Sequence, residues 1–209
     1  MIVAQQNQIV NTLNELYNDA VKDKFKIMKG LAKSVFRPMQ PADFKDVYLS
    51  ISKQQGEYLQ QLIKQNNFKN IVEFGTSFGI STLFLAQGVL ETGGHIITTE
   101  LIETKAKKAI ENFKKAGVNE LIDVRIGDAL KTLNNHNDPI DLLLLDGWKD
   151  LYLAIFQTLE HNFHNNSVIY VDNANMEEAK TFLKTISKNK KYQLQPQLGG
   201  KVVLITIKK

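Results

Sequence analysis

Short apolar runs alternate with longer amphipathic stretches along most of this chain. The apolar runs are rich in Ile, Val and Leu, which is typical of buried β-strands, and most of the stretches between them place apolar residues at helical spacing. The predicted strands are Asn70–Phe74, His95–Glu100, Ile122–Ile126, Ile140–Leu145 and Val168–Val171. The predicted helices are Ser81–Leu90, Glu103–Ala116, Tyr152–His161 and Glu177–Ser187. The second of these is predicted to expose its lysines, which are Lys105, Lys107, Lys108, Lys114 and Lys115.

Two further β segments follow the alternating region. Tyr192–Gln195 and Lys201–Ile207 are joined through a glycine pair, which predicts an antiparallel edge. The run Leu142–Leu145 has no polar position, which indicates a strand that is covered on both faces. The chain is therefore predicted to have an α/β fold, with a doubly wound, Rossmann-like sheet of seven strands that is mainly parallel and has an antiparallel edge.

The first part of the chain is predicted to be helical. Two amphipathic helices extend to about Lys45, and another begins after Ser52. The second helix is rich in lysine, and we favour a solvated face with an apolar stripe docked on the core or on a partner subunit over a helix that binds membrane or RNA. We expect a helical extension over residues 1–45, one domain over residues 46–209, and a homodimer formed through the extension.

Composition narrows the possible functions. The chain has 209 residues, 43% of them hydrophobic and 23% charged, as expected of a globular protein, and it shows neither a leader nor a membrane span, so the cytoplasm is the expected location. It has no cysteine, which excludes disulfides, thiolate zinc sites and cysteine nucleophiles. The net charge is +4, yet residues 46–183 hold 12 Lys and Arg against 18 Asp and Glu. The basic residues thus lie outside the predicted site region, and we expect no nucleic-acid partner.

A glycine turn lies between the first predicted strand and the following helix. The segment Ile71–Ser81 reads IVEFGTSFGIS, so that a strand ends at Gly75 and a helix begins after Gly79. In α/β nucleotide-binding sites such a turn brings the backbone close to a ligand and directs helix N–H groups at it. The segment therefore predicts a cofactor loop. Glu73 lies inside the strand, where it either caps loop amides or orients a cationic cofactor.

Glycines and acids follow the other predicted strands. Glu100, 25 residues after Gly75, ends the second strand, and the third is followed by Asp128. Ligands of open α/β sheets bind at the carboxyl ends of the strands, where an acid accepts hydrogen bonds from ribose hydroxyls. Glu100 is accordingly predicted to bind the ribose of a nucleoside cofactor, and the alternative is an acid that stabilises the N-terminus of the next helix.

Three oxygen donors follow the fourth and fifth strands. Asp146 ends one, and Asp172 with Asn173 ends the other. Carboxylate and amide oxygens are suitable ligands for Mg²⁺, which completes its shell with water or substrate. The three residues are therefore predicted to bind a divalent metal, although Asp172 and Asn173 alone could form an Asx turn.

The strand-end motifs together resemble a known family. Residues Gly75–Ser81, Glu100, DLLLLDGWKD (Asp141–Asp150) and VIYVDNA (Val168–Ala174) are similar to the class I metal-dependent O-methyltransferases, which include catechol and caffeoyl-CoA O-methyltransferases. The resemblance covers roughly Ser50–Ala174. It implies S-adenosylmethionine as cofactor, Mg²⁺ or another divalent cation, and a small hydroxylated acceptor.

The resemblance also implies roles for individual residues. The methionine end of the cofactor would be surrounded by Ile51, Glu73, Gly75, Thr76 and Ser81. The ribose would be held by Glu100, and the adenine would be bordered by Asp128, Ala129 and Trp148. Asp146 would also contact the cofactor. The metal would be bound by Asp146, Asp172 and Asn173. Lys149 would be the general base, beside Asp146 as the second catalytic residue, and its alternative is a surface lysine at a helix start.

Two departures and three rival functions qualify this interpretation. Catechol-type members use a further acid downstream to bind the second hydroxyl, but no Asp or Glu follows Glu178, and Gly147 is smaller than in several relatives. A dehydrogenase that uses NAD would explain Gly75 and Glu100 but not the three metal donors. A nucleic-acid amino methyltransferase would need an Asn/Asp-Pro-Pro-aromatic motif in place of DGWK. A binding module of the same fold without turnover is the third rival.

Overall fold

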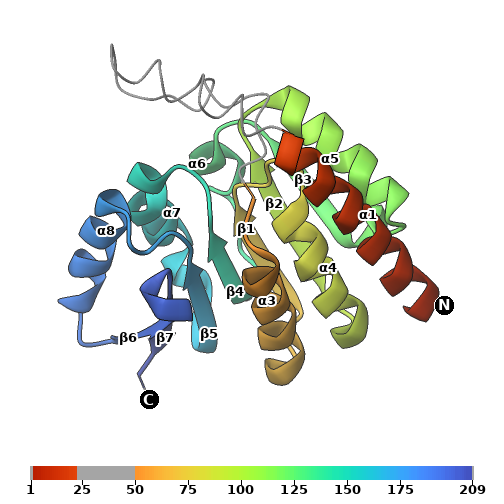
Figure 1. Cartoon of the computed structure of the whole chain (residues 1–209). Coiled ribbons are helices and arrows are strands. Elements are labelled where there is room, and N and C mark those ends of the chain that lie inside the picture. The colour runs from red at the N-terminus through yellow and green to blue at the C-terminus, as the bar shows by residue number, and fades with distance from the viewer. Residues whose placement is uncertain (1, 23–49, 209) are drawn as a thin grey trace, which may run out of the picture.

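The structure is a computed structural model and describes residues 2–22 and 50–208. It contains one seven-stranded sheet in the order β3-β2-β1-β4-β5-β7-β6, with helices on both faces (Figure 1). The strands are β1 (Asn70–Phe74), β2 (His95–Glu100), β3 (Ile122–Ile126), β4 (Ile140–Leu145), β5 (Phe163–Val171), β6 (Tyr192–Gln197) and β7 (Val202–Ile207). The first five are parallel, and β7 pairs antiparallel with both β5 and β6. The predicted α/β sheet with an antiparallel edge is thereby confirmed.

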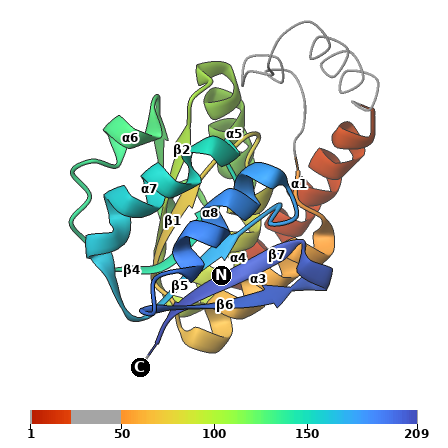
Figure 2. The ribbon, with the colours of Figure 1, turned by 90° about the vertical axis from the view of Figure 1, so that its left-hand side faces the viewer.

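The helices form two layers around this sheet (Figures 1 and 2). The bounds are α1 (Ile2–Lys22), α3 (Lys53–Asn66), α4 (Ile80–Thr92), α5 (Glu103–Lys115), α6 (Ala129–Thr132), α7 (Tyr152–Leu159) and α8 (Glu177–Ser187). Buried side chains of α1, α3, α4 and α5 form one core with one face of the sheet, and those of α6, α7 and α8 form a second core with the other face. Within the described ranges, each helix is too short or too polar to cross a membrane.

Helix α1 packs on the first of these cores. Its residues Ile9, Leu13 and Leu16 are buried, and the side-chain amide of Gln6 donates to the carbonyl of Gln87 in α4 at 3.0 Å. This is the first of the two helices predicted for the N-terminal extension. The second lies outside the described residues.

Helices α3 and α4 approach each other closely because each presents a glycine. A Cβ atom on Gly56 would lie 2.2 Å from the Phe84 ring, and one on Gly88 would lie 2.8 Å from Ile63. Only glycine permits this separation, since side chains at van der Waals contact stand further apart. The N-terminal end of α3 is therefore held close against α4.

Strand β5 begins five residues earlier than the apolar pattern predicts. The prediction started at Val168 because Asn165 and Asn166 interrupt the apolar run. Both asparagines are solvent-exposed in the structure, and the pairing of β4 with β5 shifts register between Ile140 and Leu142. A polar segment at the exposed start of a strand carries no apolar periodicity, so the pattern could not reveal it.

Candidate active site

The sheet order brings four strand ends together. Strands β2, β1, β4 and β5 are neighbours, and Phe74 pairs with Thr99 on one side and with Leu145 on the other. Leu145 in turn pairs with Val171. The segments that follow these strands, including Glu100, Gly75, Asp146 and Asp172, therefore meet at one edge of the sheet, as the sequence predicted.

Gly75 brings the loop after β1 against the loop after β4. Its φ angle is +107°, and a Cβ atom there would lie 2.7 Å from the backbone of Gly147. The backbone N–H groups of Gly75 and Thr76 both donate to the carbonyl of Thr99, at 3.2 and 3.0 Å. Gly147 is itself required, because a Cβ there would lie 2.5 Å from the Phe74 ring. The small residue noted in the sequence thus accommodates an aromatic ring of β1.

Glu73 lies in β1, just before the loop that contains Gly75 and Gly79, which we call the glycine loop, and it is fully buried. Its Oε2 accepts hydrogen bonds from the hydroxyls of Thr82 and Thr98, both at 2.5 Å, while Oε1 has no partner. Burial raises the pKa of Glu73, although the Thr82 and Thr98 hydroxyls and the nearby Ser81 hydroxyl oppose the shift. An unpaired buried carboxylate oxygen is unfavourable unless a donor reaches it. Oε1 of Glu73 therefore retains unused acceptor capacity.

We expect Glu73→Gln to stabilise the free protein increasingly as the pH rises. Burial raises the pKa of Glu73 above its ordinary value of 4.5, so stability from this group is present at low pH and is lost as the carboxyl ionises. Glutamine does not ionise. Urea unfolding should show little difference between the two proteins at pH 4, and a difference of about 1–2 kcal/mol in favour of the variant at pH 8. A pH-independent difference would contradict this account.

Glu100 binds backbone groups on two sides. Its Oε2 accepts from the N–H of Ser77 at 2.8 Å and its Oε1 from the N–H of Ile102 at 2.9 Å. The second bond lies at the start of α5, as the structural alternative predicted, and the first connects Glu100 to the glycine loop. Each carboxylate oxygen can accept a second hydrogen bond, so these contacts leave Glu100 able to bind hydroxyl groups.

Lys105 corrects one prediction. Helix α5 was expected to expose its lysines, since Lys107, Lys108, Lys114 and Lys115 alternate with its apolar stripe, but Lys105 is only 4% exposed. Its Nζ lies 3.5 Å from the hydroxyl of Ser77 and 5.2 Å from the centre of the Phe78 ring. The glycine loop covers this lysine. The helical periodicity of α5 describes only the helix itself, so it could not predict that contact.

The remaining cofactor candidates flank the glycine loop. Asp128 caps α6 by accepting from the N–H of Leu130 at 3.0 Å, and Ala129 is buried. The indole N–H of Trp148 donates to Asp150 at 3.2 Å. Ile51 precedes the glycine loop in the chain. Its carbonyl accepts from the Tyr17 hydroxyl at 3.0 Å, which connects α1 to the segment before α3.

Asp146 and Asp172 form an acidic pair. The backbone N–H of Asp146 donates to Phe74 and that of Asp172 to Leu145, both at 3.0 Å, so the sheet hydrogen bonds extend to both residues. Burial and the neighbouring Asp172 carboxyl raise the pKa of Asp146 well above its ordinary value, against the opposing charge of Lys149. Asn173 follows with φ +51°. Two adjacent acids with so little compensating charge are typical of a cation site.

This donor set is small. Within residues 2–22 and 50–208, no three or more His, Cys, Asp or Glu side chains gather into a metal cluster. The candidate ligands are two carboxylates and the amide of Asn173, which suits a hard cation that keeps several water or substrate ligands.

Lys149 points back at the acidic pair. Its Nζ donates to the carbonyl of Gly147 at 3.0 Å and lies 3.7 Å from Oδ1 of Asp146. It also lies over the ring of Tyr152, 5.7 Å from its centre. The lysine is therefore largely buried at the strand edge and differs from the alternative of a solvated surface lysine.

Sequence reasoning missed two residues that contact the acidic pair. The side-chain amide of Gln55 donates to Oδ1 of Asp172, and the Tyr152 hydroxyl donates to the backbone carbonyl of Asp172 at 3.3 Å. The pattern Ser52-x-x-Gln55 marks a capping box at a helix start. It indicates where α3 begins, but it carries no information about a contact more than one hundred residues away.

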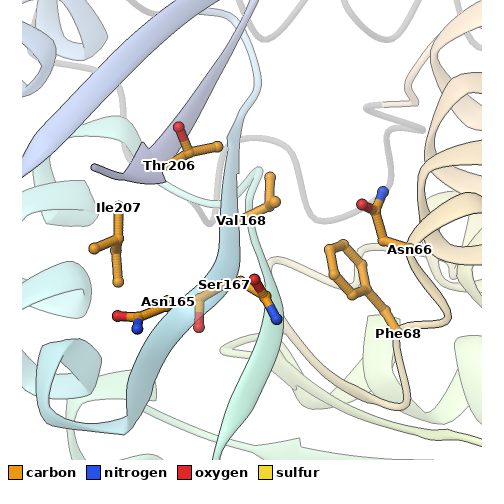
Figure 3. A pocket seen from close by; sticks show the side chains of 8 residues that line it. Asn66, Phe68, Asn165, Ser167, Val168, Thr206 and Ile207 are labelled. Carbon is orange, nitrogen blue, oxygen red and sulfur yellow. The ribbon is translucent and has the colours of Figure 1, made fainter. Parts of the chain in front are cut away.

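A hollow lies at the opposite edge of the sheet. It has a volume of about 400 Å³, and Figure 3 shows it between the end of α3, the start of β5 and the end of β7. Its lining residues are Asn66, Phe68, Asn165, Asn166, Ser167, Val168, Thr206 and Ile207. Because the parallel strands begin at this edge and end at the other, the hollow is separate from the candidate site.

Comparisons with known proteins agree with this geometry. The sequence model of the O-methyltransferase family matches residues 18–194. A catechol O-methyltransferase of Niastella koreensis is 28% identical over 171 residues, which cover 80% of this chain and 74% of that protein. One of Mycobacterium tuberculosis is 33% identical over 126 residues, or 60% of this chain and 57% of that protein. A caffeoyl-CoA O-methyltransferase of Medicago sativa is 32% identical over 132 residues, or 60% and 53%. The last two matches span little more than half of those relatives.

Solved structures share the fold over nearly the whole chain. An O-methyltransferase from Bacillus cereus, in complex with SAH, superposes with a TM-score of 0.72 at 26% identity and covers 95% of this chain and 91% of its own. A protein from Klebsiella pneumoniae described as a putative O-methyltransferase has a TM-score of 0.71 at 20% identity, with 88% and 97% covered, and shows the fold alone. The resemblance of the strand-end motifs is confirmed: this chain belongs to the O-methyltransferase family, whose members are enzymes.

Proposed function

We propose that this protein transfers a methyl group from S-adenosylmethionine to a hydroxyl group of a small aromatic acceptor that is held at a divalent metal ion. The observation that carries the proposal is the close approach of Gly75 and Gly147. The glycine loop, which we propose binds the cofactor, is in contact with the segment that contains Asp146 and Lys149. A methyl donor and an activated hydroxyl must meet in line, and this contact supplies the required proximity.

The residues of the glycine loop fit the cofactor. The unpartnered Oε1 of Glu73 is suited to the ammonium of the methionine portion, and Ile51, Gly75, Thr76 and Ser81 would surround that portion. Glu100 retains acceptor capacity for the ribose hydroxyls, and Asp128, Ala129, Trp148 and Asp146 would border the rest. When bound, S-adenosylmethionine supplies a methyl group on a positively charged sulfur.

The acidic pair fits a divalent cation such as Mg²⁺. Asp146 and Asp172 bring two carboxyl groups into one largely buried place, and the raised pKa of Asp146 reflects charge that the protein leaves uncompensated. Asn173 would add an amide oxygen. When bound, the metal would lower the pKa of a hydroxyl ligand, which matters because a phenol has a pKa of ~10.

Lys149 is the proposed general base. The carbonyl of Gly147 and the Tyr152 ring hold its Nζ near Asp146, where Lys149 in its neutral amine form would take the proton of the acceptor hydroxyl and become an ammonium. The site lacks the further acid that binds the second hydroxyl in catechol-type members, because no Asp or Glu follows Glu178. We therefore favour an acceptor whose binding does not need a carboxylate at a second hydroxyl. The homodimer and the cytoplasmic location stay predictions.

The test is methyl transfer to a panel of phenols and catechols. With S-adenosylmethionine and Mg²⁺ we expect turnover of at least one acceptor, and about tenfold less or no turnover in EDTA or with Asp172→Asn. Turnover that is indifferent to both changes would refute the metal assignment. Binding of S-adenosylhomocysteine with no methylated product would support a binding module, and binding of a nicotinamide cofactor in its place would support a dehydrogenase.

A further inference from the structure

Gln55 contacts Asp172 from a distant part of the chain. Gln55 is 1% exposed and Asp172 is 3% exposed, so the hydrogen bond between their side chains is buried. The amide nitrogen of Gln55 donates to Oδ1 of Asp172. One of the four candidate carboxylate oxygens of the metal site is thus bound by a neutral side chain from the N-terminal end of α3.

The other end of the Gln55 amide is surrounded by donors. Its Oε1 accepts from Nζ of Lys201 at 2.8 Å, from the hydroxyl of Ser52 at 2.9 Å and from the N–H of Ser52 at 3.1 Å. In the reversed orientation, the NH₂ group would face these donors and the carbonyl would face the Asp172 carboxylate, so neither group would have a hydrogen-bond partner. The hydrogen-bond network therefore determines the orientation of Gln55, with its NH₂ group toward Asp172.

Three separate segments meet in this contact. Ser52 and Gln55 belong to the capping box of α3, Asp172 follows β5, and Lys201 immediately precedes β7. The backbone N–H of Ala174 also donates to the carbonyl of Lys201 at 2.9 Å, which fixes the lysine beside the segment that contains Asn173. The ammonium of Lys201 polarises the amide, and a polarised amide is a better donor to a carboxylate.

We propose that Gln55 is a positioning residue for the metal ligand Asp172, and that Lys201 strengthens its effect. This inference rests on the metal site of the proposed function. The bond from Gln55 to Oδ1 fixes the rotation of the Asp172 carboxylate and leaves its second oxygen for the cation. Residues that orient metal ligands in this way typically change metal affinity about 10–100-fold when they are replaced.

A purely structural role for Gln55 makes a different prediction. As a capping residue, Gln55 would affect the stability of α3 but not the affinity of the folded protein for a metal. The distinguishing measurement is therefore metal binding without cofactor or acceptor, at a temperature at which circular dichroism shows every variant to be folded. Mn²⁺ is the probe, because it prefers the same oxygen ligands as Mg²⁺.

The affinity for Mn²⁺, measured by calorimetric titration with the metal alone, should fall about 10–100-fold in Gln55→Met. Methionine preserves an unbranched side chain but cannot donate a hydrogen bond to Asp172. Lys201→Met, which removes only the polarising charge, should weaken binding in the same direction and by less. The matched control is Gln54→Met, an exposed neighbour on the same helical turn, whose Kd should equal that of the wild type.

The outcomes separate this inference from the proposed function. If the wild type does not bind Mn²⁺, or if Asp172→Asn leaves its Kd unchanged, the metal site itself is wrong. If Asp172→Asn weakens binding while Gln55→Met and Lys201→Met match Gln54→Met, the metal site stands and the role of Gln55 is refuted. Should Gln55→Met fail to fold, Lys201→Met decides, and an unchanged Kd in that variant overturns the proposal.

Discussion

Replacing Lys149 by methionine is expected to lower kcat for methyl transfer about 10²–10⁴-fold, the usual contribution of a positioned general base. Methionine preserves the length of the side chain and its packing against Tyr152 but cannot accept a proton. The affinity for S-adenosylhomocysteine should change little, because Lys149 itself is not among the residues proposed to border the cofactor. Turnover kinetics and calorimetry on the same preparation measure the two quantities.

The matched control is Lys107→Met on α5. Lys107 is exposed and pairs with Glu103 four residues earlier, so its replacement removes a lysine of equal charge away from the site. We expect its kcat to equal that of the wild type. A Lys149→Met enzyme with the kcat of the control would show that another group, or the metal alone, removes the proton.

Gly75→Ala is expected to reduce both stability and activity. The φ angle of +107° would cost an alanine about 1–3 kcal/mol, and its Cβ would lie 2.7 Å from the Gly147 backbone, which adds about 1–3 kcal/mol of overpacking. The free energy of unfolding should therefore fall by about 2–6 kcal/mol. Because the same contact aligns cofactor and acceptor, kcat/KM should also fall about 10²-fold.

Gly127→Ala separates the two costs. Its φ angle of +122° is similar, but its Cβ would meet only Thr132, at 3.9 Å, an ordinary contact. Urea unfolding of Gly127→Ala should thus report the backbone cost alone, and Gly75→Ala should lose more. Equal losses would mean that the loops after β1 and β4 can separate without penalty, and the proximity argument would then be wrong.

The candidate site could be predicted from sequence to a large extent because parallel strands impose a common edge. Once Asn70–Phe74 and Ile140–Leu145 are identified as strands, the residues after them must lie together whatever the helices do. The order of the strands did not follow from the pattern. The structure supplies it and thereby makes Asp146 the neighbour of both Gly75 and Asp172.

What the sequence could not reveal depends on contacts between distant segments. Gln55 carries a local signal only as part of a capping box, and its bond to Asp172 depends on how α3 packs on α4 through Gly56 and Gly88. Lys105 fits the exposed lysines of α5 in periodicity, but the loop at Ser77 and Phe78 covers it. Glu100 accepts from the N–H of Ile102 just before α5 and from the N–H of Ser77 in the loop after β1, and its binding of a ribose stays a prediction.

Strand β7 lies between β5 and β6, although it is the later of the two edge strands in the chain. During synthesis, β5 therefore remains an open edge until residues 202–207 have left the ribosome and can insert beside it. Lys201 emerges immediately before them. The hydrogen bond from Lys201 to Gln55 therefore cannot form until this last part of the chain has emerged.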